Sequence, residues 1–569
     1  MRRPGWQLLI ALGGMSLVAL LLFDQSSLAE APIAPTPQPQ PGGIYTEAIV
    51  GTPRRLNPLL DTNNPVDRDL GRLIFSGLIR FDNAGRPQGD LAESWSVNPD
   101  GLKYTFSLRP NLRWHDDAPV TAGDVLFTIQ LLQDPAYPGP PDLHSFWKDV
   151  QVTSLNELTV QFILPEPYAP FLDQLSVGLL PQHLLEGLQS ASLPELDFNL
   201  RPIGTGPFRL EELISDGQKI TGAELTPFAG YYGQRPFLTS LRFRFYESET
   251  DAFVAYQSRE VDGLAQVTGE TLPDVLAEPS LNLYTGREPR LTMIVLNLNN
   301  DNMPFFKDKQ VRHALLAGLN RQGAVDTLLK GQAIVADSPI LPGNWAFNET
   351  LIPVSYEPEI AEVLLQAAGW RPPPGTSPGD LGYVRTKDGR ELSFTIVSPE
   401  DDTHRALTEA AQQNWALLGV RTGIKLVPAA QMLSEYLSPR SFEAILTELN
   451  LAHFPDPDPY PFWHQTQAES GQNYGQLDER SISESLELAR ITTNPEDRAK
   501  LYRTFQSRFA AQTPVLLLYY PVYNYAVSSN LRGITLGPLV SPADRFNTVA
   551  DWHIVADQVE ASPTALPIP

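Results

Sequence analysis

Hydrophobic and polar residues alternate most regularly between Leu102 and Leu108, where every second side chain is apolar. This period of two is typical of a half-buried strand. The preceding Asp100-Gly101 favours a tight turn, because glycine tolerates a positive φ. Thr121 and Asp124 then stand before a dense apolar run, which is the pattern of a capped helix start. The stretch 92–125 therefore predicts a strand, a loop and a helix, in that order.

Comparable patterns recur along the rest of the chain. Apolar residues return every four positions from Val311 to Leu319 and from Leu501 to Phe509, the second time after a capping Asn494. Gly369 and Gly419 mark helix ends, and the continuous apolar run 515–520 is typical of a central strand. We expect strands over 44–49, 291–298, 392–397 and 515–520, and helices over 70–80, 249–258, 311–320, 361–370, 403–418 and 494–513.

Length and composition narrow the class of protein. A chain of 569 residues exceeds one ordinary hydrophobic core, so two or three domains are expected. A net charge of −24 argues against nucleic acid as a partner, because that interaction needs a basic face. The sequence contains no cysteine, which excludes disulfides, thiolate metal sites, cysteine nucleophiles and a lipid-modified cysteine anchor.

The first residues have the pattern of an export signal. Arg2 and Arg3 precede an apolar run from Leu8 to Phe23, and Ser27-Leu28-Ala29 follows. The run is somewhat shorter than the roughly 20 residues of a spanning helix. Residues 1–29 are therefore predicted to be a cleaved signal peptide, with an uncleaved N-terminal anchor as the alternative. Residues 30–43, rich in Pro, Ala and Gln, predict an extended spacer. We expect an exported protein, periplasmic or at the cell surface, and tethered only if the first segment stays uncleaved.

A search for catalytic patterns is negative. Gly375, Ser377 and Gly379 have the spacing that surrounds a serine nucleophile, but prolines precede and interrupt them, whereas a nucleophile elbow needs a strand before it and a helix after it. The eight histidines are scattered without metal-ligand spacing. We therefore predict no enzymatic activity, no metal site and no cofactor.

Several ordered motifs resemble those of the family 5 extracytoplasmic solute-binding proteins. These are the peptide-, nickel- and oligosaccharide-binding receptors of ABC importers. The longest matching block is 92–125, in which Trp114, His115 and Asp116 are interpreted as packing and turn residues rather than as a site. The resemblance spans roughly Gly42 to His553. Further matching motifs are Gly204–Phe208, Val311–Leu315 and Ala361–Trp370.

The resemblance implies a fold and a division of the chain. It implies a mixed α/β, two-lobed periplasmic-binding-protein-like fold (class II, cluster C) with an extra subdomain in lobe one. The expected hinge strands cross near Pro289 and Val527. Lobe one is expected to take residues 42–64, 201–288 and 527–556, the extra subdomain 65–200, and lobe two 289–526.

The resemblance also implies a function. It implies a monomeric receptor that captures a peptide or related small solute between its lobes and delivers it to ABC permease subunits in the membrane. An oligosaccharide or metal-chelate receptor is the alternative in the same class. A ligand sensor or chaperone that is not coupled to transport is the alternative of another class.

A loop from His453 to Trp463 is the expected centre of ligand contacts. In peptide-binding relatives an aspartate in this loop binds the free amino group of the peptide. Its place here falls on His453, or on the neighbouring Ala452 or Phe454, and none of the three is acidic. This departure argues against the family's usual contact to a free amino group, because histidine near neutral pH is a poor substitute for a fixed negative charge.

Other residues of the loop, and some outside it, are candidate ligand contacts. Asp456 and Asp458 could supply a carboxylate, or they could serve the turns that Asp-Pro sequences form. Trp463 could stack on a ligand or pack in the core. Cleft-facing turns and strand ends add five more candidates, which are Asn63, Asn64, Thr205, Asn297 and Tyr474.

Overall fold

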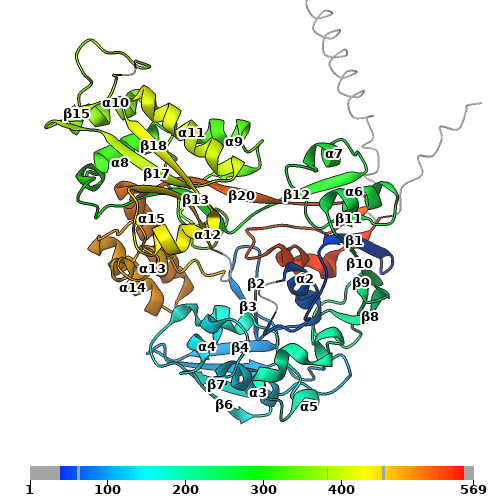
Figure 1. Ribbon diagram of the computed structural model, residues 1–569. Coiled ribbons are helices and arrows are strands. Elements are labelled where there is room, and N and C mark those ends of the chain that lie inside the picture. The colour runs from blue at the N-terminus through cyan, green and yellow to red at the C-terminus, as the bar shows by residue number, and fades with distance from the viewer. Residues whose placement is uncertain (1–38, 61–63, 381, 452–454, 556–569) are drawn as a thin grey trace, which may run out of the picture. The chain divides into compact units, whose positions relative to one another are not determined.

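The computed structural model describes residues 39–60, 64–380, 382–451 and 455–555. Almost all of them belong to one compact unit, Pro41–Ile554, of mixed α/β structure (Figure 1). The predicted signal segment 1–29 and most of the predicted spacer 30–43 lie outside the described residues. Among the helices of the described ranges, none combines the length and the apolar character that a membrane span requires.

The largest sheet has twelve strands drawn from distant parts of the chain. Its strand order is β18-β17-β19-β13-β20-β11-β1-β10-β9-β8, and β12 and β14 pair with β20 beside this path. The strands are β1 (Ile44–Val50), β8 (Phe208–Asp216), β9 (Lys219–Pro227), β10 (Ser240–Tyr246), β11 (Gly263–Leu264), β12 (Leu281–Arg287), β13 (Arg290–Leu296), β14 (Ala333–Val335), β17 (Ser393–Pro399), β18 (Arg421–Val427), β19 (Ala444–Asn450) and β20 (Val515–Ser528).

Strand β20 joins the two parts of this sheet. Residues 515–519 pair antiparallel with β13, while residues 522–528 pair antiparallel with β12 and, at their end, with β11. The chain also passes directly from β12 to β13 at residues 287–290. The predicted central strand over 515–520 is confirmed and continues to Ser528, because residues 522–528 pair with β12 and residues 523–527 are all buried.

The block 92–125 builds part of a second, four-stranded sheet with the order β4-β5-β7-β6. Helix α3 (Ala122–Gln133) packs against β6 and β7 of this sheet. The predicted helix start is confirmed, because Oγ1 of Thr121 accepts the Gly123 N–H at 3.2 Å and Oδ2 of Asp124 accepts the Thr121 N–H at 2.8 Å. The predicted strand is confirmed as β5. The strands are β4 (Ala92–Val97), β5 (Lys103–Leu108), β6 (Gln151–Asn156) and β7 (Thr159–Ile163).

Two of the motifs that carry the resemblance pack against each other. Nδ1 of His115 accepts the Gly204 N–H at 3.2 Å, and Nε2, which then carries the proton, donates to the Gly206 carbonyl at 3.1 Å. A Cβ at Gly204 would lie 1.9 Å from the Ile74 carbonyl oxygen, so only glycine fits there. Burial lowers the pKa of His115 to about 4, which keeps the ring neutral. Trp114 and His115 are thus packing residues, as expected.

Two large hydrophobic cores stabilise the unit. One combines residues of the four-stranded sheet, such as Phe106, with residues of β10, such as Phe243. The other surrounds β13, β17 and β19 and includes Ile294 and Ile396. A small third core lies beside α6 and β11 and includes Phe253. The segment predicted as an extra subdomain therefore shares a core with the segments predicted as lobe one.

Most predicted helices are present with small shifts at their ends. The helix predicted over 70–80 was wrong in its bounds. Helix α2 begins at Pro65, because Asn64 caps it, and ends at Ile74, because Phe75 is extended (φ −112°, ψ 151°). The helices are α2 (Pro65–Ile74), α4 (Pro141–Trp147), α5 (Gln182–Leu185), α6 (Glu249–Gln257), α7 (Leu272–Leu276), α8 (Lys309–Ala317), α9 (Arg321–Thr327), α10 (Pro358–Ala367), α11 (Asp402–Leu417), α12 (Ala429–Gln431), α13 (Tyr460–Trp463), α14 (Arg480–Ile491) and α15 (Pro495–Gln512), together with the 3₁₀ helices η2 (Ala169–Ser176) and η8 (Pro542–Asp551). Short strands complete the fold, namely β2 (Ile79–Phe81), β3 (Pro87–Gly89), β15 (Thr386–Lys387), β16 (Arg390–Glu391), β21 (Leu531–Arg532) and β22 (His553–Ile554).

Candidate functional site

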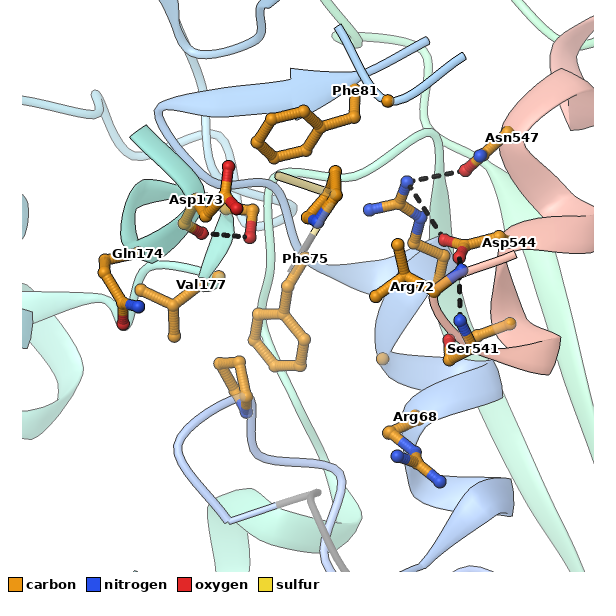
Figure 2. Close-up of a pocket in the computed structure, with 18 of the residues that line it drawn as sticks. Arg68, Arg72, Phe75, Phe81, Asp173, Gln174, Val177, Ser541, Asp544 and Asn547 are labelled. Atoms are coloured by element: carbon orange, nitrogen blue, oxygen red, sulfur yellow. Dashed lines mark hydrogen bonds and ion pairs between the residues drawn. The ribbon is translucent and has the colours of Figure 1, made fainter. Parts of the chain in front are cut away.

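A cavity of about 570 Å³ lies between helix α2, the 3₁₀ helices η2 and η8, and the turn between β2 and β3 (Figure 2). Its lining mixes aromatic and aliphatic side chains with charged and amide groups. Pockets that bind small solutes have this size and this mixed chemistry. The lining residues are Pro58, Arg68, Gly71, Arg72, Phe75, Phe81, Asp82, Gly85, Pro140, Asp142, Leu143, Asp173, Gln174, Ser176, Val177, Gly178, Pro455, Pro538, Val540, Ser541, Ala543, Asp544 and Asn547.

Helix α2 supplies the basic side of the cavity. Oδ1 of Asn64 accepts the Val66 N–H at 3.0 Å, and Pro65 occupies the first helical turn, so the helix start is fixed locally. Arg68 and Arg72, one turn apart on the same helix face, both line the cavity. Among the described residues, the guanidinium of the half-buried Arg68 has no hydrogen-bond or ion-pair partner, and only its backbone N–H is bonded, to the Asn64 carbonyl at 3.2 Å.

Helix η8 continues this wall and neutralises one of the two arginines. Arg72 donates to Oδ1 of Asn547 at 2.5 Å and lies 3.7 Å from Oδ1 of Asp544. Figure 2 shows these three side chains together on one side of the cavity. The positive charge of Arg72 is therefore balanced by the protein, while that of Arg68 is left for the cavity.

A fully buried ionic cluster ties α2 to η8 behind this wall. All five N–H groups of Arg545 donate within the protein, two to Glu47, two to Asp69 and one to the Pro542 carbonyl, at 2.6–3.1 Å. Arg545 and Glu47 are both 0% exposed. Burial raises the pKa of Glu47 despite the attraction of Arg545. Burial alone would lower the pKa of Arg545, but the charges of Asp69 and Glu47 outweigh it and hold that pKa well above its usual value. The cluster holds the cavity-lining helices at a fixed separation.

Helix η2 forms the opposite side, and Asp173 is its charged residue. Figure 2 shows Asp173, Gln174 and Val177 facing Arg68 and Arg72 across Phe75. Asp173 is only 5% exposed. Its Oδ2 accepts the Asp456 N–H at 2.9 Å, whereas its Oδ1 has no hydrogen-bond partner in the described part of the chain.

Asp173 and Asp456 are neighbouring buried carboxyls, and an arginine contacts only Asp456. Oδ2 of Asp456 lies 2.6 Å from Nη2 of Arg498 in an ion pair, and its Oδ1 accepts from the Tyr502 hydroxyl at 2.9 Å. Burial raises the pKa of Asp456 as well, but the charge of Arg498 lowers it, so Asp456 ionises more readily than Asp173. Burial, and then the charge of Asp456, raise the pKa of Asp173 well above its usual value.

The loop predicted as the centre of ligand contacts borders this cavity through Pro455. His453 and Phe454 lie outside the described residues, as does Asn63. Asp456 is engaged with Arg498, as above. Asp458 makes a two-pronged ion pair with Arg490, whose Nε and Nη2 donate at 2.7–3.1 Å. The carboxylates of Asp456 and Asp458 thus anchor this loop to α14 and α15.

Three further residues predicted as ligand contacts bind or pack against other residues of the protein. Trp463 is 4% exposed, and its ring centroid lies 4.7 Å from that of Phe509. Asn297 is buried and donates to the carbonyls of Arg440 and Phe442, both at 3.1 Å. Tyr474 is half-buried beneath the guanidinium of Arg440, 5.2 Å away.

Asn64 and Thr205 complete the predicted set. Asn64 caps α2 and also donates to the Thr52 carbonyl at 3.0 Å. Thr205 is buried between the two motif glycines, and its hydroxyl has no hydrogen-bond partner within the described ranges. Neither residue lines the cavity.

Sequence reasoning did not single out Arg68, Arg72 or Asp173. The spacing of the two arginines was a local signal, because residues four apart share a helix face. Asp173 gave no such signal, since only the fold brings it opposite α2. The described residues contain no group of three or more His, Cys, Asp or Glu side chains arranged to hold a metal ion.

Comparison with known proteins supports a solute-binding protein. The oligopeptide-binding protein AppA of Bacillus subtilis (strain 168) is 26% identical over 523 residues, which cover 90% of this chain and 92% of that protein. The structure of NikZ from Campylobacter jejuni in complex with Ni(L-His) is similar with a TM-score of 0.64 and 26% identity, over 90% of this chain and 99% of that one.

The fold is also that of HbpA2 from Haemophilus parasuis, with a TM-score of 0.77 and 20% identity over 90% of this chain and 100% of that one. This likeness confirms the predicted periplasmic-binding-protein-like fold. The family model of the bacterial extracellular solute-binding proteins, family 5, matches residues 86–472. This match covers more than half of the sequence, so the chain belongs to the family 5 extracellular solute-binding proteins, whose members act outside the cytoplasm.

Proposed function

We propose that the protein is the solute receptor of an ABC importer and captures a short peptide or a related small solute for transmembrane import. The observation that carries this proposal is the cavity of about 570 Å³ between α2, η2 and η8. It lies in the range of roughly 300–1,000 Å³ that small-solute sites occupy. The relation to AppA, an oligopeptide-binding protein, supports a peptide as the solute.

The chemistry of the cavity suits capture rather than conversion. Phe75 and Phe81 offer apolar surface, while amide and charged groups stand on both sides (Figure 2). A buried solute would exclude water from these polar contacts and so strengthen them. Members of the family are solute-binding proteins, and we propose that this chain likewise binds without transforming its ligand.

We propose that the protein works as two lobes, with residues 42–64, 201–288 and 527–556 in lobe one, 65–200 in its extra subdomain, and 289–526 in lobe two. The continuous strand β20 and the direct passage from β12 to β13 are the two crossings that support this division. The partners of β20 change at 519–522, which supports a hinge there, a few residues before the division at 526–527, and at 287–290.

The proposed setting follows from the same function. The receptor would be exported, act as a monomer in the periplasm or at the cell surface, and dock on ABC permease subunits after solute capture. The segment 1–29, if uncleaved, would tether it. A metal chelate is the second candidate solute, because NikZ binds a nickel–histidine complex and is 26% identical to this chain.

A thermal-shift screen tests the proposal. A solute that binds only the folded state stabilises it by about 2.7 kcal/mol at a concentration 100 times its Kd. We expect a clear rise in Tm with short peptides, and comparison with disaccharides and with nickel–histidine ranks the solute classes. If no peptide, sugar or chelate raises Tm, solute capture is refuted. If one does, but deletion of the gene leaves uptake of that solute unchanged, a sensor or chaperone replaces the importer receptor.

A further inference from the structure

Helices α2 and η2 each carry one charged cavity-lining residue that the protein leaves incompletely used. These are Arg68 on α2 and Asp173 on η2, and Figure 2 shows them on opposite sides of Phe75. Within the described ranges, the guanidinium of Arg68 has no polar partner and Oδ1 of Asp173 accepts no hydrogen bond. A solute in the cavity would therefore meet an unpaired cation at one end and a free carboxyl oxygen at the other.

We propose that the cavity selects a zwitterionic solute, with its ammonium group at Asp173 and its carboxylate at Arg68, as in a short peptide with free ends. This inference rests on the proposed function and adds which residues select the solute and by which of its groups. It also assigns the recognition of the amino group to η2 instead of the loop at 452–454, where no residue is acidic.

Arg68, and not Arg72, is the cation left for the solute. Arg72 already binds Asn547 and faces Asp544, so its charge is balanced. Arg68 stands one turn earlier on the same face, half-buried, with its donor fork unoccupied by described residues. A guanidinium can bind a carboxylate through two parallel hydrogen bonds, which makes it selective for an acidic group.

Asp173 is the carboxyl best placed for a cation. The arginines that bind the neighbouring loop are already paired, Arg498 with Asp456 at 2.6 Å and Arg490 with Asp458 at 2.7 Å. Each arginine is thus ion-paired with another carboxylate, and none of the ion pairs among the described residues includes Asp173. A buried carboxyl without an ion-pair partner is kept neutral by a proton, and an incoming ammonium lets it ionise because the ammonium supplies the missing counter-charge.

The protonation of Asp173 provides a specific readout. Burial and the charge of Asp456 raise its pKa well above the usual value, so the carboxyl holds a proton when no cation faces it. A solute ammonium stabilises the ionised form, and the proton then leaves to the solvent. Binding of a free amino group should therefore release a proton, whereas binding of an acylated one should not.

Calorimetric titration with trialanine, N-acetyl-trialanine and trialanine amide tests the assignment. Arg68→Gln should weaken the binding of trialanine by about 10- to 100-fold, which is the effect of losing a hydrogen bond to a charged group. The affinity for trialanine amide, which lacks the carboxylate, should stay unchanged. Asp173→Asn, which keeps the shape of the side chain, should abolish the preference for trialanine over its N-acetyl form. Arg235→Gln and Asp274→Asn, both exposed and outside the cavity lining, are the matched controls.

The same titrations are run in buffers of different ionisation enthalpy. For the wild type we expect proton release with trialanine and none with the N-acetyl form. The inference is overturned if the Arg68 and Asp173 variants keep the wild-type ratios of affinity among the three peptides. It is also overturned if the heat of trialanine binding does not depend on the buffer. If trialanine does not bind but a disaccharide or nickel–histidine raises Tm, the inference falls and the proposed function stands. If no solute binds, both fall.

Discussion

Replacement of Arg545 by methionine tests the buried cluster that holds the cavity wall. Arg545 lies between Glu47 on β1 and Asp69 on α2, and its side chain and that of Glu47 are 0% exposed. Methionine has a similar length but no charge or donors. The variant therefore leaves two carboxylates buried side by side without their counter-ion.

The expected loss follows from the geometry. Removal of one partner from a buried ion pair typically costs about 3–5 kcal/mol, because the other charge stays buried and unpaired. Here one arginine serves two carboxylates through four hydrogen bonds of 2.6–3.1 Å. Protonation of Glu47, whose pKa is already raised by burial, relieves part of this cost at lower pH. We therefore expect the free energy of unfolding to fall by about 5 kcal/mol at pH 8 and by less at pH 5.

Urea unfolding measures the loss, and peptide-resolved hydrogen exchange locates it, because the two large cores can unfold separately. Exchange should quicken in α2 and η8 and stay unchanged in β13 and β19. The triple variant Glu47→Gln, Asp69→Asn, Arg545→Met should recover most of the stability, since it removes the unpaired charges. A loss below about 1 kcal/mol for Arg545→Met alone would show that the cluster does not hold the wall.

Three further predictions concern other contacts. Gly204→Ala should cost at least about 2 kcal/mol, because the new Cβ meets the Ile74 carbonyl, whereas Gly269→Ala, with open space around it, should cost little; urea unfolding measures both. The free energy of unfolding should fall by up to about 3 kcal/mol between pH 7 and pH 4, because the unfolded state protonates His115 near 6.5 and the native ring only near 4; His115→Asn should flatten this slope. Trp463→Phe should lower Tm but leave solute affinity within about two-fold, since the side chain packs against Phe509.

Each of these predictions has a contradicting result. Equal stability of Gly204→Ala and Gly269→Ala would mean that the backbone around Ile74 yields easily. His553→Asn is the control for His115→Asn. If His115→Asn loses as much free energy of unfolding between pH 7 and pH 4 as the wild type, the buried neutral His115 is not the cause of the loss. Weaker solute binding by Trp463→Phe, with no change in Tm, would make Trp463 a ligand contact after all.

Local patterns predicted the elements well where the signal was itself local. The cap at Thr121 and the alternation before Leu108 depend on residues that touch along the chain, and both are present as expected. The helix over 70–80 was misplaced because its apolar pattern continues beyond Ile74, while the extended Phe75 interrupts it. The helix ends where Gly204 packs closely on the Ile74 carbonyl. This contact comes from a distant part of the chain, so no local sequence pattern reveals it.

The candidate site was harder to predict, because its charges meet only through the fold. Asp456 and Asp458 stood out as either ligand contacts or turn residues, and their arginine partners come from α14 and α15, far along the chain. Asp173 had no distinctive neighbours in sequence, yet it faces α2 across the cavity. Burial and pairing, which decide whether a charge is available to a ligand, are properties of the tertiary structure.

The most direct test of the account is a calorimetric titration of the solute that raises Tm most, into the wild type, Val177→Trp and Val254→Trp. Val177 lines the cavity, and a tryptophan there would fill part of its volume, whereas Val254 is 53% exposed on α6 and lies outside the lining. We predict one-to-one binding to the wild type and unchanged binding to Val254→Trp. Binding to Val177→Trp should be at least about 100-fold weaker, which corresponds to about 2.7 kcal/mol of binding free energy. Equal affinity of all three proteins would contradict capture of the solute in this cavity.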